Sequence, residues 1–235
     1  MTQLYFKQLL AGRDFATNAP GAQQMENFVY LIGDAETREC VVIDPAWDVG
    51  GLLDIVAKDD MKLVGALATH YHQDHVGGEI FGITIEGLAA LNARNPCPVH
   101  AHKLEVPGLC KVTGLSHNDF VAHESGDKVK VGNIEIELLH TPGHTPGSMC
   151  FMLKDKLISG DTLFLQGCGR VDLPGGNSEQ MYYTLTQKLS QIPNDTILFP
   201  GHAYGGSHKE MGEVKATNAM MKVKDLNDWY GLRGR

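Results

Sequence analysis

The chain has 235 residues, 43% hydrophobic and 20% charged, a composition typical of a globular protein that can bury a sizeable core. Its net charge of −8 and the lack of a basic run argue against nucleic acid as the main partner, because phosphate contacts need clustered Lys and Arg. The apolar stretches are strand-sized and residues 1–21 contain no apolar signal-peptide segment, so we expect no membrane span and a cytoplasmic location.

The cysteines are odd in number and show no paired CxxC spacing, which argues against a disulfide framework or a cysteine-rich zinc site. We expect most of them to be small buried hydrophobic residues. The strongest candidate for a reactive thiol is Cys168, because it lies in the glycine-flanked turn GCGR. The five positions are Cys40, Cys97, Cys110, Cys150 and Cys168.

The first half of the chain begins with two predicted β-strands, at 28–33 and 39–45, joined by the turn-like sequence DAETR. A short amphipathic helix is predicted over 49–60. The continuous apolar run that follows is typical of a fully buried strand at 63–68, and it ends where the sequence THYHQDH begins.

Residues 79–127 are predicted to form an excursion from this pattern. Within it, ITIEGLAALNAR at 83–94 favours a helix, and PCPVHAH at 96–102 favours a short strand. Because the excursion directly follows the histidine-rich loop, we interpret it as a candidate lid.

The second half of the chain is predicted to add more strands. KVKVGNIEIELLHTPGH forms a hairpin that turns at Gly132-Asn133, and its second strand places Ile134, Ile136 and Leu138 on one face. The segments 148–155 and 156–161 continue the sheet, and 196–202 is a further strand.

One longer helix is predicted over 178–191, with Asn177 as its N-cap and Pro193 after its end. Its apolar stripe is interpreted as core and consists of Met181, Leu185, Leu189 and Ile192. The sequence contains no repeat and no obvious linker, so we predict a single domain over 1–235.

Four predicted strands are followed by histidine or aspartate residues, which are common metal ligands. The set comprises His70, His72, Asp74, His75, His144, Asp161 and His202. A lone histidine before a turn is usually structural, but strand-end ligands from four elements can converge on one sheet edge. Seven ligands exceed what one tetrahedral ion uses and suit two ions that share a bridging carboxylate, with positions left open for water. We expect two divalent ions, zinc first, with iron and manganese as alternatives that this ligand mix also accepts.

The motif HYHQDH at 70–75 matches H-x-H-x-D-H, and TPGHTPGS, SGDTLF and PGHAY follow in order. In these motifs the chain resembles the metallo-β-lactamase superfamily, from about residue 28 onward. The resemblance implies a four-layer αββα sandwich with the metals at one edge of its two sheets. It also implies that Asp161 bridges two ions. The first ion would be held by His70, His72 and His144, and the second by Asp74, His75 and His202.

Within the superfamily, GDTLFLQGCGRVDLPGG resembles glyoxalase II, the hydroxyacylglutathione hydrolase, and also the persulfide dioxygenases. By this resemblance Arg170 and Tyr204 would bind the substrate, although Arg170 has a salt bridge with Asp172 as an alternative role. Asp172 stands where glyoxalase II usually has an aromatic residue. Only 33 residues follow His202, too few for the helical domain that completes the glutathione pocket there.

The leading hypothesis is a binuclear hydrolase that cleaves a thioester or small ester with a metal-bound hydroxide, using Asp74 and Asp161 as catalytic residues. A mononuclear iron sulfur dioxygenase is the second hypothesis, with its iron on His70, His144 and Asp161. A metal-binding protein without catalysis is the third. The partner in the first two is a small molecule, and homo-oligomerisation is left open.

The remaining histidines carry weaker predictions. We interpret His100 and His102 as a strand end or the rim of the site, and His140 as a structural residue, with support of the ligands as its alternative role. His117, His123 and His208 are predicted to be solvated. Ser148 lies in the TPGS turn and is interpreted as a cap rather than a nucleophile.

Overall fold

Two six-stranded β-sheets form the centre of the computed structural model, which describes residues 3–80 and 82–233. The first sheet has the strand order β1-β2-β3-β4-β7-β8. Its strands are β1 (Leu4–Leu10), β2 (Phe28–Asp34), β3 (Glu39–Ile43), β4 (Lys62–Leu67), β7 (Val99–His102) and β8 (Phe120–His123). A separate small hairpin pairs β5 (Gly78–Ile80) with β6 (Ile83–Ile85).

The second sheet comes entirely from the second half of the chain and has the order β14-β13-β12-β11-β10-β9. Its strands are β9 (Lys128–Val131), β10 (Ile134–His140), β11 (Met149–Leu153), β12 (Lys156–Gly160), β13 (Ile197–Pro200) and β14 (Lys209–Glu210). β12 and β13 pair in parallel, whereas the other neighbours in this sheet are antiparallel.

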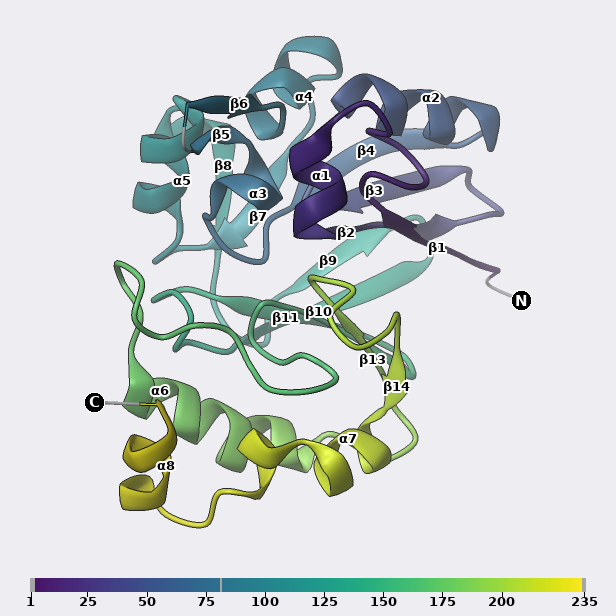
Figure 1. Ribbon diagram of the computed structural model, residues 1–235. Coiled ribbons are helices and arrows are strands. Elements are labelled where there is room, and N and C mark those ends of the chain that lie inside the picture. Colours follow the sequence, from purple (N-terminus) through teal and green to yellow (C-terminus); the bar gives the residue numbers. More distant parts are fainter. Residues whose placement is uncertain (1–2, 81, 234–235) are drawn as a thin grey trace.

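Helices cover the outer face of each sheet, as Figure 1 shows. Those on the first sheet are α1 (Pro20–Met25), α2 (Val49–Lys58), α3 (Gln73–Val76), α4 (Leu88–Arg94) and α5 (Val106–Thr113), with the 3₁₀ turn η1 (His117–Asp119). Those on the second are α6 (Ser178–Tyr183), η2 (Thr184–Lys188), η3 (Leu189–Gln191), α7 (Met211–Thr217), η4 (Ala219–Lys222) and α8 (Leu226–Arg233). The predicted four-layer αββα sandwich is confirmed.

Three apolar layers hold the sandwich together. The layer between the two sheets includes the alternating face of β10, where Ile134, Ile136 and Leu138 are buried as predicted. Alternate residues of β4 point in opposite directions, so Leu67 lies between the sheets while Ala66 and Ala68 face the first helical layer. In the second helical layer, Met181, Leu185 and Leu189 are buried in the predicted stripe.

Parallel pairing explains why the loops of interest share one edge of the sandwich. β4 pairs in parallel with β3 and β7, so these strands end on the same side of the first sheet. β12 and β13 likewise end together, and each is followed by one of the predicted ligands. The histidine loop and the later predicted ligands therefore lie at one edge of the sandwich.

The segment 79–127 differs from the prediction in its details. Helix α4 begins only at Leu88, because residues 83–85 pair with β5 instead. Gly87 precedes the helix, and a Cβ atom there would lie 2.1 Å from the carbonyl oxygen of Val76. β7 and β8 complete the first sheet, so most of this segment belongs to that sheet and its helical layer. A lid role for the segment stays a prediction.

Other differences are local. Strand β1 was not predicted, and it pairs along its whole length with β2. The helix predicted over 178–191 is regular only to Tyr183 and continues as a π-helical turn and a 3₁₀ turn before Pro193. All five cysteines are free, and none of the helices in residues 3–80 and 82–233 is long and apolar enough to cross a membrane.

Candidate metal centre

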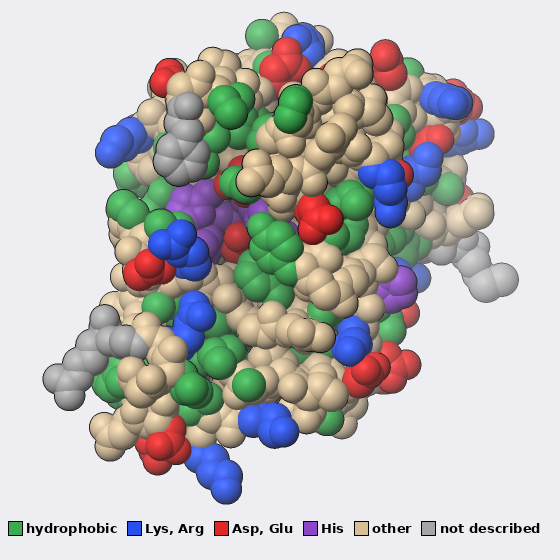
Figure 2. All heavy atoms as spheres, viewed as in Figure 1, with side chains coloured by type: hydrophobic (Ala, Val, Ile, Leu, Met, Phe, Trp, Pro, Cys, Tyr) green, Lys and Arg blue, Asp and Glu red, His purple; other side chains and the backbone are tan. Residues whose placement is uncertain are grey.

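The strand-end loops meet in a recess between the upper and lower halves of the molecule, where histidine side chains are visible in Figure 2. The loop after β4 carries four of the seven predicted ligands. The connections after β10, β12 and β13 contribute one each. The structure brings these seven side chains together.

The first group consists of His70, His72 and His144. One ligand nitrogen from each lies within 4.8 Å of the others, and His144 Nε2 is 2.9 Å from His72 Nδ1. The ring of His70 packs edge-on against both partners, with centroid distances of 4.7 and 4.8 Å. Three nitrogens that face one point in a buried setting are suited to one metal ion.

The second group consists of Asp74, His75 and His202, and its ligand atoms also lie within 4.8 Å of one another. His75 Nε2 is 3.2 Å from His202 Nε2 and 3.3 Å from a carboxylate oxygen of Asp74. Helix α3 begins within the loop and turns Asp74 and His75 to this side. All three side chains are buried.

Asp161 lies between the two groups. One of its carboxylate oxygens is 3.3 Å from His202 Nε2 and 3.8 Å from His144 Nε2, and the other is 3.3 Å from His75 Nε2. A single carboxylate is thereby placed to contact an ion in either group. This is the position that a bridging ligand requires.

Two buried atoms of the cluster have no hydrogen-bond partner among the described residues, namely His70 Nε2 and Asp161 Oδ1. An unpaired buried polar atom costs free energy, which a bound cation would remove. The donor set of imidazole nitrogens and carboxylates also fits borderline divalent ions. The residues present therefore fit a metal at this place.

The two groups differ in their protonation. Burial, with the neighbouring His144, lowers the pKa of His72 to about 4, and burial also holds the pKa values of His70 and His144 below their usual range. In the second group burial acts in the same direction, but the carboxylates of Asp74 and Asp161 outweigh it and raise the pKa of His75. The same balance with Asp161 raises the pKa of His202.

Hydrogen bonds on the far ring nitrogens orient the ligands. His144 Nδ1 is 2.7 Å from the carbonyl oxygen of Arg170, and His202 Nδ1 is 2.6 Å from that of Met25. Each carbonyl accepts a hydrogen bond from Nδ1, so Nε2 is the ring nitrogen that faces the cluster. The backbone of the loop after β12 thus fixes a ligand that comes from the loop after β10.

Asp44 is an orienting residue that the sequence reasoning missed. It follows β3, and its Oδ2 accepts from Thr69 Oγ1 at 2.6 Å and lies 3.0 Å from His75 Nδ1. Its Oδ1 accepts from the Thr69 amide at 2.8 Å. The signal was present, because Asp44 is a carboxylate at the end of the strand beside β4.

Asn27 was also missed. Its Nδ2 donates to Asp74 at 2.9 Å, and its own oxygen accepts from Trp47 Nε1 at 2.9 Å. An asparagine before a strand has no distinctive sequence signal.

The predicted substrate-binding residues lie at the rim. Arg170 is exposed and forms a two-point salt bridge with Asp172, with N–O distances of 3.0 and 2.7 Å. Tyr204 is 44% exposed and its ring stacks on that of His202 at 4.6 Å. Cys168, in contrast, is buried, which raises the pKa of its thiol to about 11 and makes it unreactive.

The other histidines form pairs beside this cluster. His102 is buried and stacks on His140 at 3.9 Å, while His140 Nε2 lies 2.9 Å from the carbonyl oxygen of Pro146. His100 Nδ1 is 2.9 Å from His123 Nε2. The prediction that His123 is solvated is wrong, because it is half-buried between His100 and Asp127.

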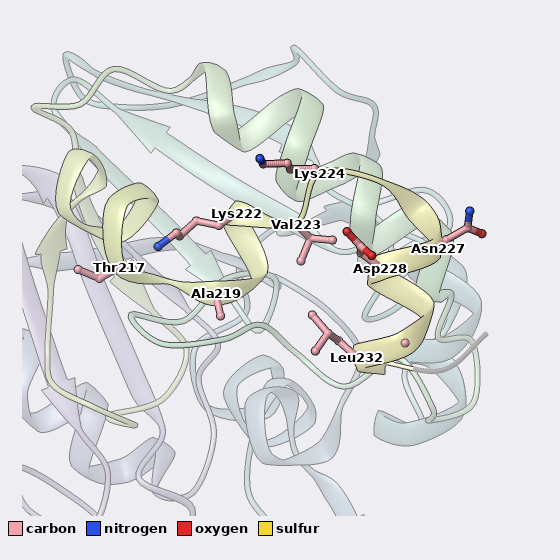
Figure 3. Close-up of a pocket in the computed structure, with 9 residues that line it drawn as sticks. Thr217, Ala219, Lys222, Val223, Lys224, Asn227, Asp228 and Leu232 are labelled. Carbon is pink, nitrogen blue, oxygen red and sulfur yellow. The ribbon is translucent and has the colours of Figure 1, made fainter.

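A second concavity lies in the C-terminal segment, between η4 and α8, and has a volume of about 760 Å³ (Figure 3). None of the predicted ligands lines it. The ammonium groups of Lys222 and Lys224 lie apart in the close-up and do not converge on Asp228.

Fold and site together define an αββα protein with adjacent His/Asp clusters that could hold metal ions. The sequence matches the model of the metallo-β-lactamase superfamily over residues 24–80 and 85–202. The chain belongs to the metallo-β-lactamase superfamily.

Enzymes of two kinds are among the relatives. The chain is 33% identical to a probable hydroxyacylglutathione hydrolase of Schizosaccharomyces pombe, over 88% of this chain and 73% of that protein. It is 32% identical to the persulfide dioxygenase ETHE1 of Homo sapiens, over 76% of this chain and 65% of that protein. The crystal structure of ETHE1 from Myxococcus xanthus superposes with a TM-score of 0.79 at 32% identity, covering 97% of this chain and 89% of that one. Both suspected branches are thus represented.

Proposed function

We propose that the protein is a binuclear metal-dependent hydrolase that cleaves a thioester or a related small ester. The observation that carries this proposal is the second group, Asp74, His75 and His202, which is as compact as the first and shares Asp161 with it. Seven side chains of ligand type in this arrangement are more than one tetrahedral ion uses.

The residues would act as follows. His70, His72 and His144 would hold one ion, Asp74, His75 and His202 the other, and Asp161 both. When bound, two divalent ions supply activation of water and polarisation of the acyl carbonyl. We expect zinc, with iron and manganese as alternatives.

The protein groups around the ions supply orientation and charge. Despite burial, the histidines beside Asp161 lower the pKa of its carboxyl group, so it is ionised at neutral pH. Burial and the carboxylates of Asp161 and Asp74 raise the pKa of Tyr204, so its phenol stays protonated and can donate to an acyl oxygen at the rim. A thiol leaving group has a pKa of about 8.5, so no dedicated general acid is required.

A mononuclear iron dioxygenase is the second candidate. The 32% identity to ETHE1 from Homo sapiens and the agreement with the Myxococcus xanthus structure favour it. In that reading His70, His144 and Asp161 would hold one iron, and the second group would have no metal to bind.

The two hypotheses predict different numbers of ions per chain and different effects of His202→Ala. We would measure ions per chain, thioester turnover and oxygen uptake with a persulfide for the wild type, His202→Ala and the control His208→Ala. His208 is exposed on the same β13–β14 connection and stacks on Phe199.

A hydrolase should bind about two ions, and His202→Ala should lose one of them together with much of kcat. His208→Ala should match the wild type. A single iron with oxygen uptake that survives His202→Ala would favour the dioxygenase. If the protein bound metal but turned over neither substrate, the third hypothesis, a metal-binding protein without catalysis, would be favoured.

A further inference from the structure

Glu105 is a fully buried carboxylate outside the seven predicted ligands, at the beginning of α5. Its Oε1 accepts hydrogen bonds from Thr145 Oγ1 at 2.7 Å and from the Gly147 amide at 2.6 Å. Its Oε2 is buried as well. A buried glutamate is costly, and burial raises the pKa of Glu105 to about 7.

The hydrogen bonds of the Glu105 side chain do not stabilise its own helix. It occupies the N-cap position of α5, but its side chain makes no capping hydrogen bond. Its hydrogen bonds go instead to the loop 141–148, which carries His144. That loop is packed tightly on the carboxylate, because a Cβ atom on Gly147 would lie 2.8 Å from Glu105 Cγ.

The same helix also supports the other ligand loop of the first group. Tyr71 lies between His70 and His72, and its ring rests on Gly108 of α5, where a Cβ atom would come within 2.5 Å of it. Helix α5 thus touches both loops that supply the first group. Glu105 is the polar link from this helix to the His144 loop.

We propose that Glu105 is a positioning residue: its carboxylate fixes the His144 loop on α5, opposite Tyr71, and so sets the metal affinity of the group His70, His72 and His144. This inference rests on the proposed function only in that this group binds a metal. Loss of the Oε1 acceptor would leave Thr145 held only within its own loop, by Ser148, and would detach the Gly147 amide from α5. His144 would then no longer be held in register with His72.

The test is a cobalt titration of metal-stripped full-length protein, followed by competition with a chelator and by the visible absorption of bound Co²⁺. The variants are Glu105→Ala, which removes the acceptor, and Glu105→Gln, which keeps an acceptor oxygen in the same place. Each is also made with His202→Ala, so that only the first group keeps all its ligands.

The matched control is Asp34→Ala. Asp34 is also fully buried, and its carboxylate accepts from the Asn133 amide and side chain at 2.8 and 2.7 Å. It lies at the opposite end of β2 from the site, about 20 Å away for a strand of this length. It should lower thermal stability without changing cobalt affinity.

We expect Glu105→Ala to weaken cobalt binding at the first group by about tenfold or more and to alter its absorption, and Glu105→Gln to stay within about threefold of the wild type. Unchanged affinity in Glu105→Ala, an equal loss in Glu105→Gln, or an equal loss in Asp34→Ala would overturn the proposal. If Glu105→Ala does not fold, the same titration is made with Thr145→Val, which removes a donor to Oε1 and the contact with Ser148, and with Ser148→Ala, which removes only the latter. A loss of affinity in Thr145→Val that Ser148→Ala does not share supports the proposal, and equal affinities in the two variants overturn it. Absence of thioester turnover in the wild type would count against the proposed reaction and not against this role.

Discussion

Asp161 contacts histidines of both groups, at 3.3 Å in the second and 3.8 Å in the first. Its side chain is only 12% exposed, and one of its oxygens has no hydrogen-bond partner among the described residues. A carboxylate in this position would neutralise part of the charge of an ion held by either group. Its removal should therefore affect both sites.

We predict that Asp161→Ala lowers the metal content below that of the wild type and reduces kcat by about a hundredfold or more, because each ion loses a ligand. Elemental analysis of the purified variant and a thioester assay would measure this. Asp155→Ala, which removes an exposed carboxylate from the turn between β11 and β12, is the control. A fully loaded and active Asp161→Ala variant would contradict the bridging role.

The guanidinium of Arg170 is occupied by Asp172, and both side chains are about two-thirds exposed. An exposed pair of this kind contributes little to stability. Its effect on the rim is electrostatic, since it leaves no free positive charge on Arg170 for an anionic substrate.

We predict that Asp172→Ala frees Arg170 and raises kcat/KM for thioesters with an anionic thiol by about two- to tenfold, while neutral thioesters are unaffected. Steady-state kinetics with one substrate of each charge would show the difference. An equal change for both substrates would mean that Arg170 does not meet the substrate, and Asp155→Ala again serves as the control.

At the level of elements, the strands were the most predictable part of the chain. Apolar runs and alternation located the buried strands of both sheets, because these strands are stabilised by burial. Five strands escaped prediction. β1 and β8 are the edge strands of the first sheet and are only partly buried, and β5, β6 and β14 are two or three residues long. The C-terminal part of the helix 178–191 has the expected stripe, but its backbone opens into a π-helical turn that side-chain periodicity does not reveal.

The site was predictable for a related reason. The ligand candidates follow strand ends, and strand ends are what the apolar pattern marks. The residues that hold these side chains in place could not be found in the same way. Glu105 and Asn27 act through contacts between segments 40 or more residues apart in the sequence, and such contacts exist only once the sheets are stacked.

Helix α8 is attached to the second helical layer mainly through Trp229. This side chain is fully buried in the apolar cluster beneath the second sheet, and its Nε1 donates to Ser178 Oγ at 2.9 Å. Arg233 at the end of the helix donates to the carbonyl oxygen of Gly169, one residue before Arg170. The helix therefore supports the loop whose backbone orients His144.

We predict that Trp229→Ala lowers the free energy of unfolding by about 3–5 kcal/mol, because it leaves a large cavity and removes the hydrogen bond to Ser178. Leu232→Ala on the same helix should change it by less than about 0.5 kcal/mol, since Leu232 is 60% exposed. Urea unfolding of the metal-free proteins would measure both. Equal effects of the two substitutions would show that α8 is not anchored by the tryptophan.

On the scale of the whole molecule, metal ions should compete with protons more easily at the first group than at the second. The pKa of His72 is lowered to about 4, so the first group stays deprotonated and ready to bind in mild acid. The pKa values of His75 and His202 are raised, so in the metal-free protein these side chains hold protons that an incoming ion must displace.

We predict that the second ion is released before the first as the pH falls, and that the first ion remains until the pH approaches about 4. Ions per chain after equilibration with a chelator at stepped pH values would show two steps. His202→Ala should show only the step at lower pH. Simultaneous release in the wild type would contradict the assignment of the two groups.

The division of the seven side chains between the two sheets has a consequence for synthesis of the chain. The loop with four of them follows β4, but each group needs at least one partner from beyond residue 143. The strands of the first sheet are complete once His123 has left the ribosome, when neither group yet has its full set. Neither group can therefore be completed until the second sheet is being made, and a ribosome-bound chain halted before β13 would lack His202 and with it the full second group.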